Sequence, residues 1–352
     1  MPVLDTSRAI EDRVRAIRSY HDDVGTTRAE LDVSGGVDSA VMLGLLASAL
    51  GPDNVTAVYT GISSSPQSLE RASAAAEKFA VRLVRLDLTD LVQRINDTVA
   101  DALRDAGHPL DEIVARVAAD RTIEGSFRSC LRAPVGRYLN RLTGGGIRHG
   151  TGNECEDRWL RFYQKGGDGE VDTNPIAMMS KGETFQLAIA LGVPREILVA
   201  LPSPDLWGNG DQHNDEDELL RISGVEWTYS RVDPDSGHYV RVGTIERLSR
   251  FLDHNFSAWF DSCCGINGAW LFANYQGVDE ISGSWTFDMD ALVREAIPFF
   301  PGHGAEHVRD FLASAKKWER ATRHKMNPNC PALGSRRELV EAGILTNTLP
   351  EV

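Results

Sequence analysis

The chain has 352 residues, 37 basic and 51 acidic, which gives a net charge of −14 at pH 7. Proteins that neutralise nucleic-acid phosphates carry basic runs or stripes, and this sequence has none. It also lacks a run of about 18 apolar residues and an apolar signal core at the N-terminus. We therefore expect a cytoplasmic protein with no nucleic-acid partner and no membrane partner.

The cysteines are odd in number and have no C-x-x-C spacing, so they predict neither a disulfide framework nor a zinc site. A chain of this length forms an apolar core without such cross-links. Adjacent thiols could act as a redox pair, but two buried, reduced thiols are the simpler interpretation. The five are Cys130, Cys155, Cys263, Cys264 and Cys330.

Apolar residues at helical spacing in residues 8–24 predict an amphipathic leading helix. After it, strand and helix patterns alternate. The strand patterns are at 31–33, 54–59 and 82–88, and the helix patterns are at 38–50, 66–80 and 90–106. Such alternation is typical of right-handed βαβ units. We therefore predict a Rossmann-like α/β fold, with a parallel sheet and helices on both faces.

The second half of the chain has weaker strand signals. Residues 107–125 are helical and charged, and a glycine-rich segment at 143–152 leaves room only for a short strand at 147–149. Helical spacing returns in three later segments. These segments are 156–165, 181–192 and 305–320.

A glycine pair separates the first strand from the next helix, in the segment Ser34-Gly35-Gly36-Val37-Asp38-Ser39. Adjacent glycines let the backbone turn with its N–H groups inward, and the helix N-terminus adds a positive dipole end. Ser34 and Ser39 can donate hydroxyl hydrogen bonds, and Asp38 can hold Mg²⁺. The segment therefore predicts a phosphate site at the carboxyl edge of the sheet, with an ordinary serine-capped turn as the alternative.

The S-G-G-x-D-S pattern resembles the signature of the N-type ATP pyrophosphatases, which cleave ATP between its α- and β-phosphates. Residues 150–156, G-T-G-N-E-C-E, resemble a segment of one group among them, the ammonia-dependent NAD synthetase family. The resemblance implies that Glu156 and Asp38 share one Mg²⁺. If the resemblance is set aside, Glu156 could simply complement the dipole of its helix.

Further segments match that family in the same order, over residues 30–225 and 315–330. They are Ser63-Ser64 with Ser68, residues 163–172, Pro175-Ile176 with Lys181, residues 202–206, Asp215-Glu216 and His324-Lys325. The resemblance implies an adenine nucleotide alpha hydrolase-like version of the predicted fold. It also implies a homodimer in which helices of both subunits build the acceptor pocket.

The resemblance assigns roles to individual residues. Asp38, Lys181 and Glu156 would be catalytic, with Lys181 at the α-phosphate, although a lone lysine is more often a solvated helix residue. The implied ATP-binding residues are Ser34, Gly35, Gly36, Asp38, Ser39, Thr151, Lys181 and Ser203. The implied substrate-binding residues are Arg132, Lys165, Asp168, Asp172, His324 and Lys325. Without the resemblance, the aspartates could serve a glycine-rich turn and the His-Lys pair could lie on the surface.

The sequence departs from the family's pattern mainly on the acceptor side. Where the family has Asn and Arg, this chain has Ser126 and Cys130, so an amide and a cation are missing. Residues 256–305 also look like an insertion, either a lid or a dimer element. We therefore expect residues 1–255 and 306–352 to form one domain, interrupted by this insertion.

Three functions are compatible with this pattern. The first is an ammonia-dependent NAD synthetase, in which the carboxylate of deamido-NAD attacks the α-phosphate of ATP, pyrophosphate leaves, and ammonia converts the acyl-adenylate into NAD and AMP. The second is an amide ligase of the same fold that acts on a different carboxylic acid, for example in specialised metabolism. The third is a nucleotide-binding or regulatory protein without turnover, which would not need Asp38, Glu156 and Lys181 together.

Overall fold

The computed structural model describes most of the chain. The described residues are 4–120, 122–201, 203, 214–260, 276–278, 285–287, 289–322, 325 and 335–349. His324, Cys263, Cys264, Cys330 and much of 256–305 lie outside them. The division into a domain and an insertion therefore stays a prediction.

Four parallel strands form the central sheet in the order β3-β2-β1-β4. They are β1 (Ala29–Asp32), β2 (Val55–Gly61), β3 (Arg82–Asp87) and β4 (Ile147–His149). Leu31 is in register with Ala57 on one side and with His149 on the other. The parallel sheet predicted from the alternating pattern is therefore confirmed, including its short fourth strand.

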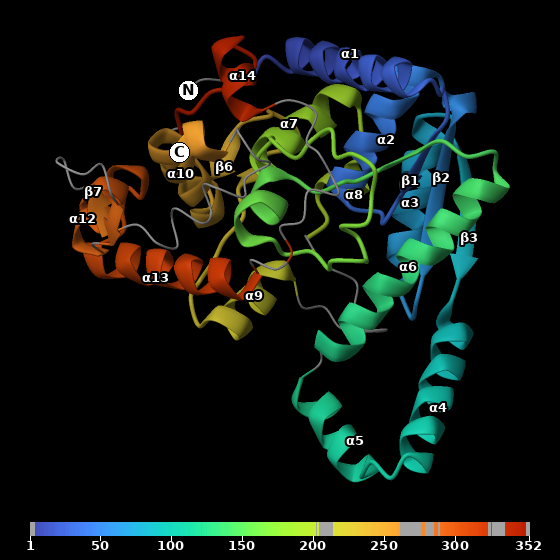
Figure 1. The fold of residues 1–352 in the computed structure, drawn as a ribbon. Helices are drawn as coiled ribbons and strands as arrows, with labels where there is room; N and C mark the ends of the chain where they lie inside the picture. The colour runs from blue at the N-terminus through green and yellow to red at the C-terminus, as the bar shows by residue number, and fades with distance from the viewer. Residues whose placement is uncertain are drawn as a thin grey trace.

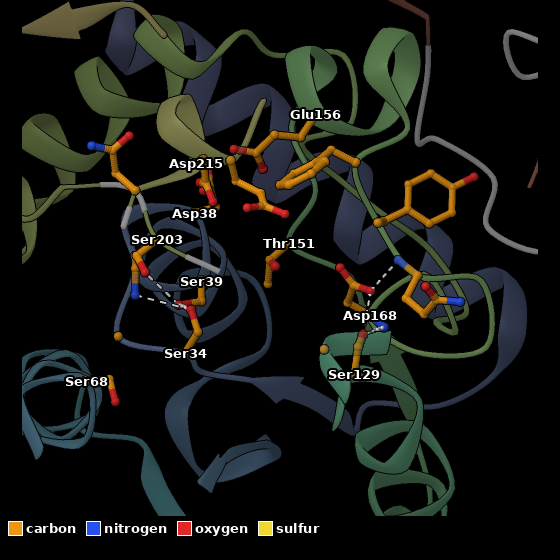
Figure 2. A pocket seen from close by; sticks show the side chains of 18 of the residues that line it. Ser34, Asp38, Ser39, Ser68, Ser129, Thr151, Glu156, Asp168, Ser203 and Asp215 are labelled. Atoms are coloured by element: carbon orange, nitrogen blue, oxygen red, sulfur yellow. Dashed lines mark hydrogen bonds between the residues drawn. The ribbon is translucent and has the colours of Figure 1, made fainter. Parts of the chain in front are cut away.

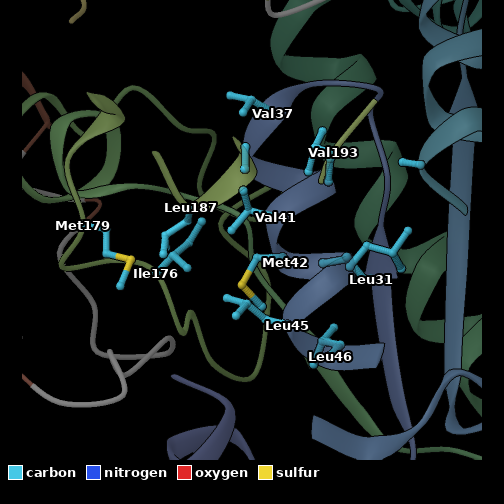
Figure 3. Packing of buried hydrophobic residues seen from close by; sticks show 14 of the residues in the cluster. Leu31, Val37, Val41, Met42, Leu45, Leu46, Ile176, Met179, Leu187 and Val193 are labelled. Atoms are coloured by element: carbon cyan, nitrogen blue, oxygen red, sulfur yellow. The ribbon is translucent and has the colours of Figure 1, made fainter. Parts of the chain in front are cut away.

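Helices cover the sheet as the right-handed connections require (Figure 1). The helices that belong to this layer are α1 (Thr6–Val24), α2 (Val37–Leu50), α3 (Pro66–Lys78) and α7 (Lys181–Leu191), with short η1 (Pro52–Asn54) and α8 (Arg195–Leu198). Ten of the 14 residues of α2 are buried, because α1, α7 and the sheet surround the helix. Figure 3 shows Val41 and Met42 of this helix between Leu31 and Ile176. The buried helix fixes the position of the loop that precedes it.

Two helices leave the body of the molecule and a third returns to it (Figure 1). We call this unit the arm; it consists of α4 (Thr89–Asp105), α5 (Leu110–Ala119) and α6 (Thr122–Leu142). In α4 only Val92 is buried, and in α5 no residue is. The middle of α6 contacts β4, where Arg148 Nη1 donates to the carbonyl of Ala133 at 2.9 Å. Helix α6 therefore connects the arm to the sheet.

A second apolar cluster forms in the later part of the chain, around Trp227, Phe251 and Phe300. The elements of this part of the chain are η2 (Glu154–Leu160), α9 (Asp215–Ser223), β5 (Arg231–Val232), β6 (Tyr239–Arg241), α10 (Thr244–Phe260), β7 (Gln276–Val278), β8 (Trp285–Phe287), α12 (Met289–Ala296), η4 (Ile297–Phe299), α13 (Ala305–Thr322) and α14 (Arg336–Glu341). Val232, Tyr239 and Leu339 pack in the first cluster, beside the sheet. The helix predicted at 156–165 is a π-helix that ends at Leu160, because Arg161 has a left-handed φ of 50°. No helix in the described part of the chain has the length and apolar character that crossing a membrane requires.

Candidate active site

The loop between β1 and α2 has the features of an anion site. Gly35 has a φ of +84°, and a Cβ there would lie 2.3 Å from the carbonyl oxygen of Ser68, so only glycine fits. Gly36 caps α2 without a side-chain hydrogen bond, which leaves the first N–H groups of the helix available. Ser39 Oγ lies 3.2 Å from Ser34 Oγ at the mouth of the loop (Figure 2). The loop therefore brings two hydroxyl groups next to the backbone N–H groups at the start of α2.

Three charged side chains from distant segments meet beside this loop. Lys181 Nζ donates to Asp38 Oδ2 at 2.7 Å and to Glu156 Oε1 at 2.8 Å. Asp38 belongs to the first turn of α2, Glu156 to η2, and Lys181 to the start of α7. The three residues predicted to be catalytic are therefore neighbours in the structure.

Burial and charge act in opposite directions on this cluster. Burial alone would lower the pKa of Lys181, but Asp38 and Glu156 outweigh it and raise the pKa above its usual value. Lys181 is therefore an ammonium ion at neutral pH. Nearby, burial and the charge of Glu156 raise the pKa of Asp215 to about 7. Asp215 Oδ1 has no hydrogen-bond partner among the described residues.

The paired carboxylates suit a magnesium ion that is also bound to phosphate. Asp38 and Glu156 are brought close together because both bind Lys181 Nζ, and carboxylate oxygens are the ligands that Mg²⁺ prefers. Among the described residues, no three His, Cys, Asp or Glu side chains are grouped as a complete metal cage. An ion held here would therefore need phosphate oxygens and water as its other ligands, which is usual for Mg²⁺ in nucleotide sites.

A cavity of about 1350 Å³ extends from the loop past this cluster to α6. All the predicted ATP-binding residues line it, including Thr151 and Ser203. On the acceptor side Arg132, Asp168 and Lys325 line it as well. Figure 2 shows Asp168 and Ser129 across the cavity from Ser34. The cavity therefore contains residues of both halves of the predicted site.

Two predicted substrate residues do not line the cavity. Lys165 is exposed on the loop before Asp168. Asp172 pairs with Arg137 Nη1 at 2.8 Å and accepts a hydrogen bond from the backbone of Arg148. In this structure Asp172 therefore ties β4 to α6. His324 lies outside the described residues.

Two serines of α6 form hydrogen bonds with the loop of residues 163–169. Ser129 Oγ donates to Asp168 Oδ1 at 2.9 Å, and Ser126 Oγ donates to Gln164 Oε1 at 2.9 Å. Ser126 stands where the family's pattern has asparagine, and it lines the cavity. Cys130, the other departure, is not among the lining residues. On the altered acceptor side, these hydrogen bonds therefore hold the loop against α6.

A buried ionic network holds the two helices that carry Glu156 and Lys181. Arg336 forms a two-point pair with Glu183, with both N–O distances at 3.0 Å, and Arg250 Nη1 donates to Glu154 Oε2 at 2.9 Å. All four side chains are at most 6% exposed. Burial alone would raise the pKa of Glu183, but Arg336 and Arg250 lower it to about 2.

The sequence patterns missed this network, and they also missed Arg71, which lines the cavity. Glu183 forms a capping box with Ser180 at the start of α7, a pattern visible in the sequence as S-K-G-E. Nothing in the sequence indicated that Arg250 and Arg336, far along the chain, would meet it.

Together, the fold and the loop define an α/β nucleotide-binding protein with a phosphate site at the carboxyl edge of its sheet. A protein-family model described as NAD synthase matches residues 9–234 of this chain. The chain therefore belongs to the NAD synthase family, as its motifs predicted.

Known relatives agree with this assignment. The chain is 31% identical over 216 residues to an NH(3)-dependent NAD(+) synthetase of Archaeoglobus fulgidus, covering 58% of this chain and 79% of the relative. It is 30% identical over 210 residues to the Methanococcoides burtonii protein of the same name, covering 59% and 70%. The structure of NMN synthetase from Francisella tularensis superposes with a TM-score of 0.52 at 22% identity, covering 61% of this chain and 81% of that one. The last match confirms the fold.

Proposed function

We propose that this chain is an ammonia-dependent NAD synthetase, which uses ATP to convert the carboxylate of deamido-NAD into an amide. The observation that carries the proposal is the position of Lys181 between Asp38 and Glu156, beside the open N-terminus of α2. This arrangement places a permanent cation next to a phosphate site. The relatives named NH(3)-dependent NAD(+) synthetase support the same reaction.

In this proposal a carboxylate oxygen of deamido-NAD attacks the α-phosphorus, and the bond to the bridging oxygen breaks to release pyrophosphate. Ammonia then attacks the acyl carbon, AMP leaves, and the nitrogen gives up its extra proton. The N–H groups at the start of α2 hold phosphate oxygens, and Lys181 stabilises the charge that develops at the α-phosphate. Asp38 and Glu156 would hold Mg²⁺, which neutralises the phosphates when bound.

The experiment is an assay with purified chain, deamido-NAD, ATP, Mg²⁺ and ammonium. We expect NAD, AMP and pyrophosphate in equal amounts, and far less NAD when glutamine replaces ammonium. A folded sample that binds ATP but forms no NAD would contradict the proposal. Pyrophosphate release only with another carboxylic acid would favour the alternative ligase, and ATP binding without release on any acid would favour the regulatory protein.

We also propose a homodimer, with the arm of each subunit packed against the other. The arm exposes several large apolar side chains, which a second copy would cover. They are Leu91, Val99, Val114, Tyr138 and Leu142, each at least 40% exposed. Because α6 also carries Ser126 and Ser129, such packing would bring the second subunit close to the acceptor side of the cavity.

The dimer predicts a mass by light scattering of twice 38.6 kDa at micromolar concentration. Replacing Val99 and Val114 with lysine should shift the mass to that of a monomer, because charged groups would then lie in an apolar contact. Replacing Val24 with lysine is the control, since Val24 is 55% exposed on α1, outside the arm. A monomer mass for the unmodified chain would contradict the dimer.

A further inference from the structure

A second cation lies at the cavity, on a helix that contributes no predicted site residue. Arg71 belongs to α3, and its Nε donates to the carbonyl oxygen of Gly35 at 3.0 Å. Helix α3 approaches the loop closely at this point, since the carbonyl of Ser68 leaves no space for a Cβ at Gly35. The side chain of Arg71 therefore lies directly against the phosphate loop.

The hydrogen bond to Gly35 orients the guanidinium of Arg71 and engages one of its N–H donors. A guanidinium carries five N–H donors, of which Nε supplies one, so four remain on the two Nη atoms. No carboxylate of the described residues pairs with Arg71, which also lines the cavity. A planar fork of donors held by a backbone carbonyl is well suited to two oxygens of a phosphate.

Arg71 and Lys181 reach the loop from different sides. Lys181 binds Asp38, at the helix end of the loop, whereas Arg71 binds the carbonyl of Gly35, at its turn. In the view of Figure 2, Ser34 lies between Asp38 and Ser68, which is on the same helix as Arg71. A polyphosphate with its α-phosphate at Lys181 and its chain across the loop would therefore run toward Arg71.

We propose that Arg71 binds the terminal phosphates of ATP and, after the first chemical step, the pyrophosphate that leaves. This inference rests on the proposed function, because it takes Lys181 as the partner of the α-phosphate. In this role Arg71 neutralises the charge that accumulates on the leaving group when the bond from the α-phosphorus breaks. AMP has no atoms that would reach Arg71.

The test is the affinity of the full chain for ATP, pyrophosphate and AMP, measured by calorimetry at fixed Mg²⁺ concentration. In Arg71→Met we expect binding of ATP and pyrophosphate to weaken by about 10- to 100-fold, the effect of a lost charge-assisted hydrogen bond. Binding of AMP should stay within about twofold. Lys78→Met, which removes an exposed cation at the far end of α3, is the control for net charge.

Two further variants separate phosphate binding from a purely structural role at the loop. Arg71→Lys keeps the charge and should recover part of the affinity for pyrophosphate, whereas the neutral donor in Arg71→Gln should not. Unchanged affinities in Arg71→Met, equal weakening for AMP, or full recovery by glutamine would overturn the proposal. Because no turnover is needed, failure of the chain to make NAD would count against the proposed function alone.

Discussion

Replacing Glu156 with glutamine is expected to lower the rate of amide formation by about 10²- to 10³-fold and to leave the fold intact. The substitution keeps the shape of a side chain that is close to Lys181 and Asp38 but removes its charge. In the proposed mechanism the pair holds Mg²⁺, and losing that charge would weaken the binding of the ion. Lys181 also loses one of its two carboxylate partners. The measurement is kcat at saturating ATP, with circular dichroism as the check on the fold.

Glu196→Gln is the matched control, because Glu196 is exposed on α8 and should leave kcat unchanged. A near-normal rate and magnesium dependence in Glu156→Gln would remove this residue from the metal site. Glu154 of the same segment is then a poor substitute, since Arg250 and Arg336 already bind it. The next candidate would be the buried Asp215, which lines the cavity.

Replacing Arg336 with methionine is expected to reduce the free energy of unfolding by about 3–5 kcal/mol. Among the residues that the structure describes, the change leaves the buried Glu183 with Arg250 as its remaining cationic partner, at 3.3 Å. Urea denaturation followed by circular dichroism measures the loss. Arg337→Met is the control: Arg337 forms an exposed pair with Glu341 on the same helix and should change stability by less than about 1 kcal/mol. Equal losses in the two variants would contradict a special role for Arg336.

The same network predicts how stability depends on pH. The pKa of Glu183 is lowered in the folded state to about 2, below its value of 4.5 in an unfolded chain. Its stabilising contribution is therefore complete above pH 4.5 and is lost as the pH falls from 4.5 toward 2. In Arg336→Met this loss should be smaller, because the cation that lowers the pKa most strongly is gone.

The sheet and the phosphate loop are predictable from the sequence because their signals are local. Alternating strand and helix patterns define β1 to β3, and Gly35 of the loop has a backbone conformation that other residues rarely adopt. Asp38, Glu156 and Lys181 are far apart in the sequence, so local patterns could not predict their proximity. Only the resemblance to a family indicated it. The structure then confirmed their proximity.

The features that the sequence did not predict depend on contacts between remote elements. Arg71 lies within an ordinary helix, and only the packing of α3 on the loop makes it part of the cavity. Arg250 and Arg336 resemble any other arginines on amphipathic helices until α10 and α14 are placed beside Glu154 and Glu183. Asp172 was assigned to the substrate from its motif, whereas here it binds Arg137.

The central claim is that this chain activates a carboxylate by adenylation. It is tested most directly with deamido-NAD labelled with ¹⁸O in its carboxylate, incubated with the chain, ATP, Mg²⁺ and ammonium. Attack of the carboxylate on the α-phosphorus transfers one labelled oxygen to AMP, so mass spectrometry should find one ¹⁸O in each AMP formed. Label in inorganic phosphate, with ADP as the nucleotide product, or NAD formation with unlabelled AMP would contradict the account.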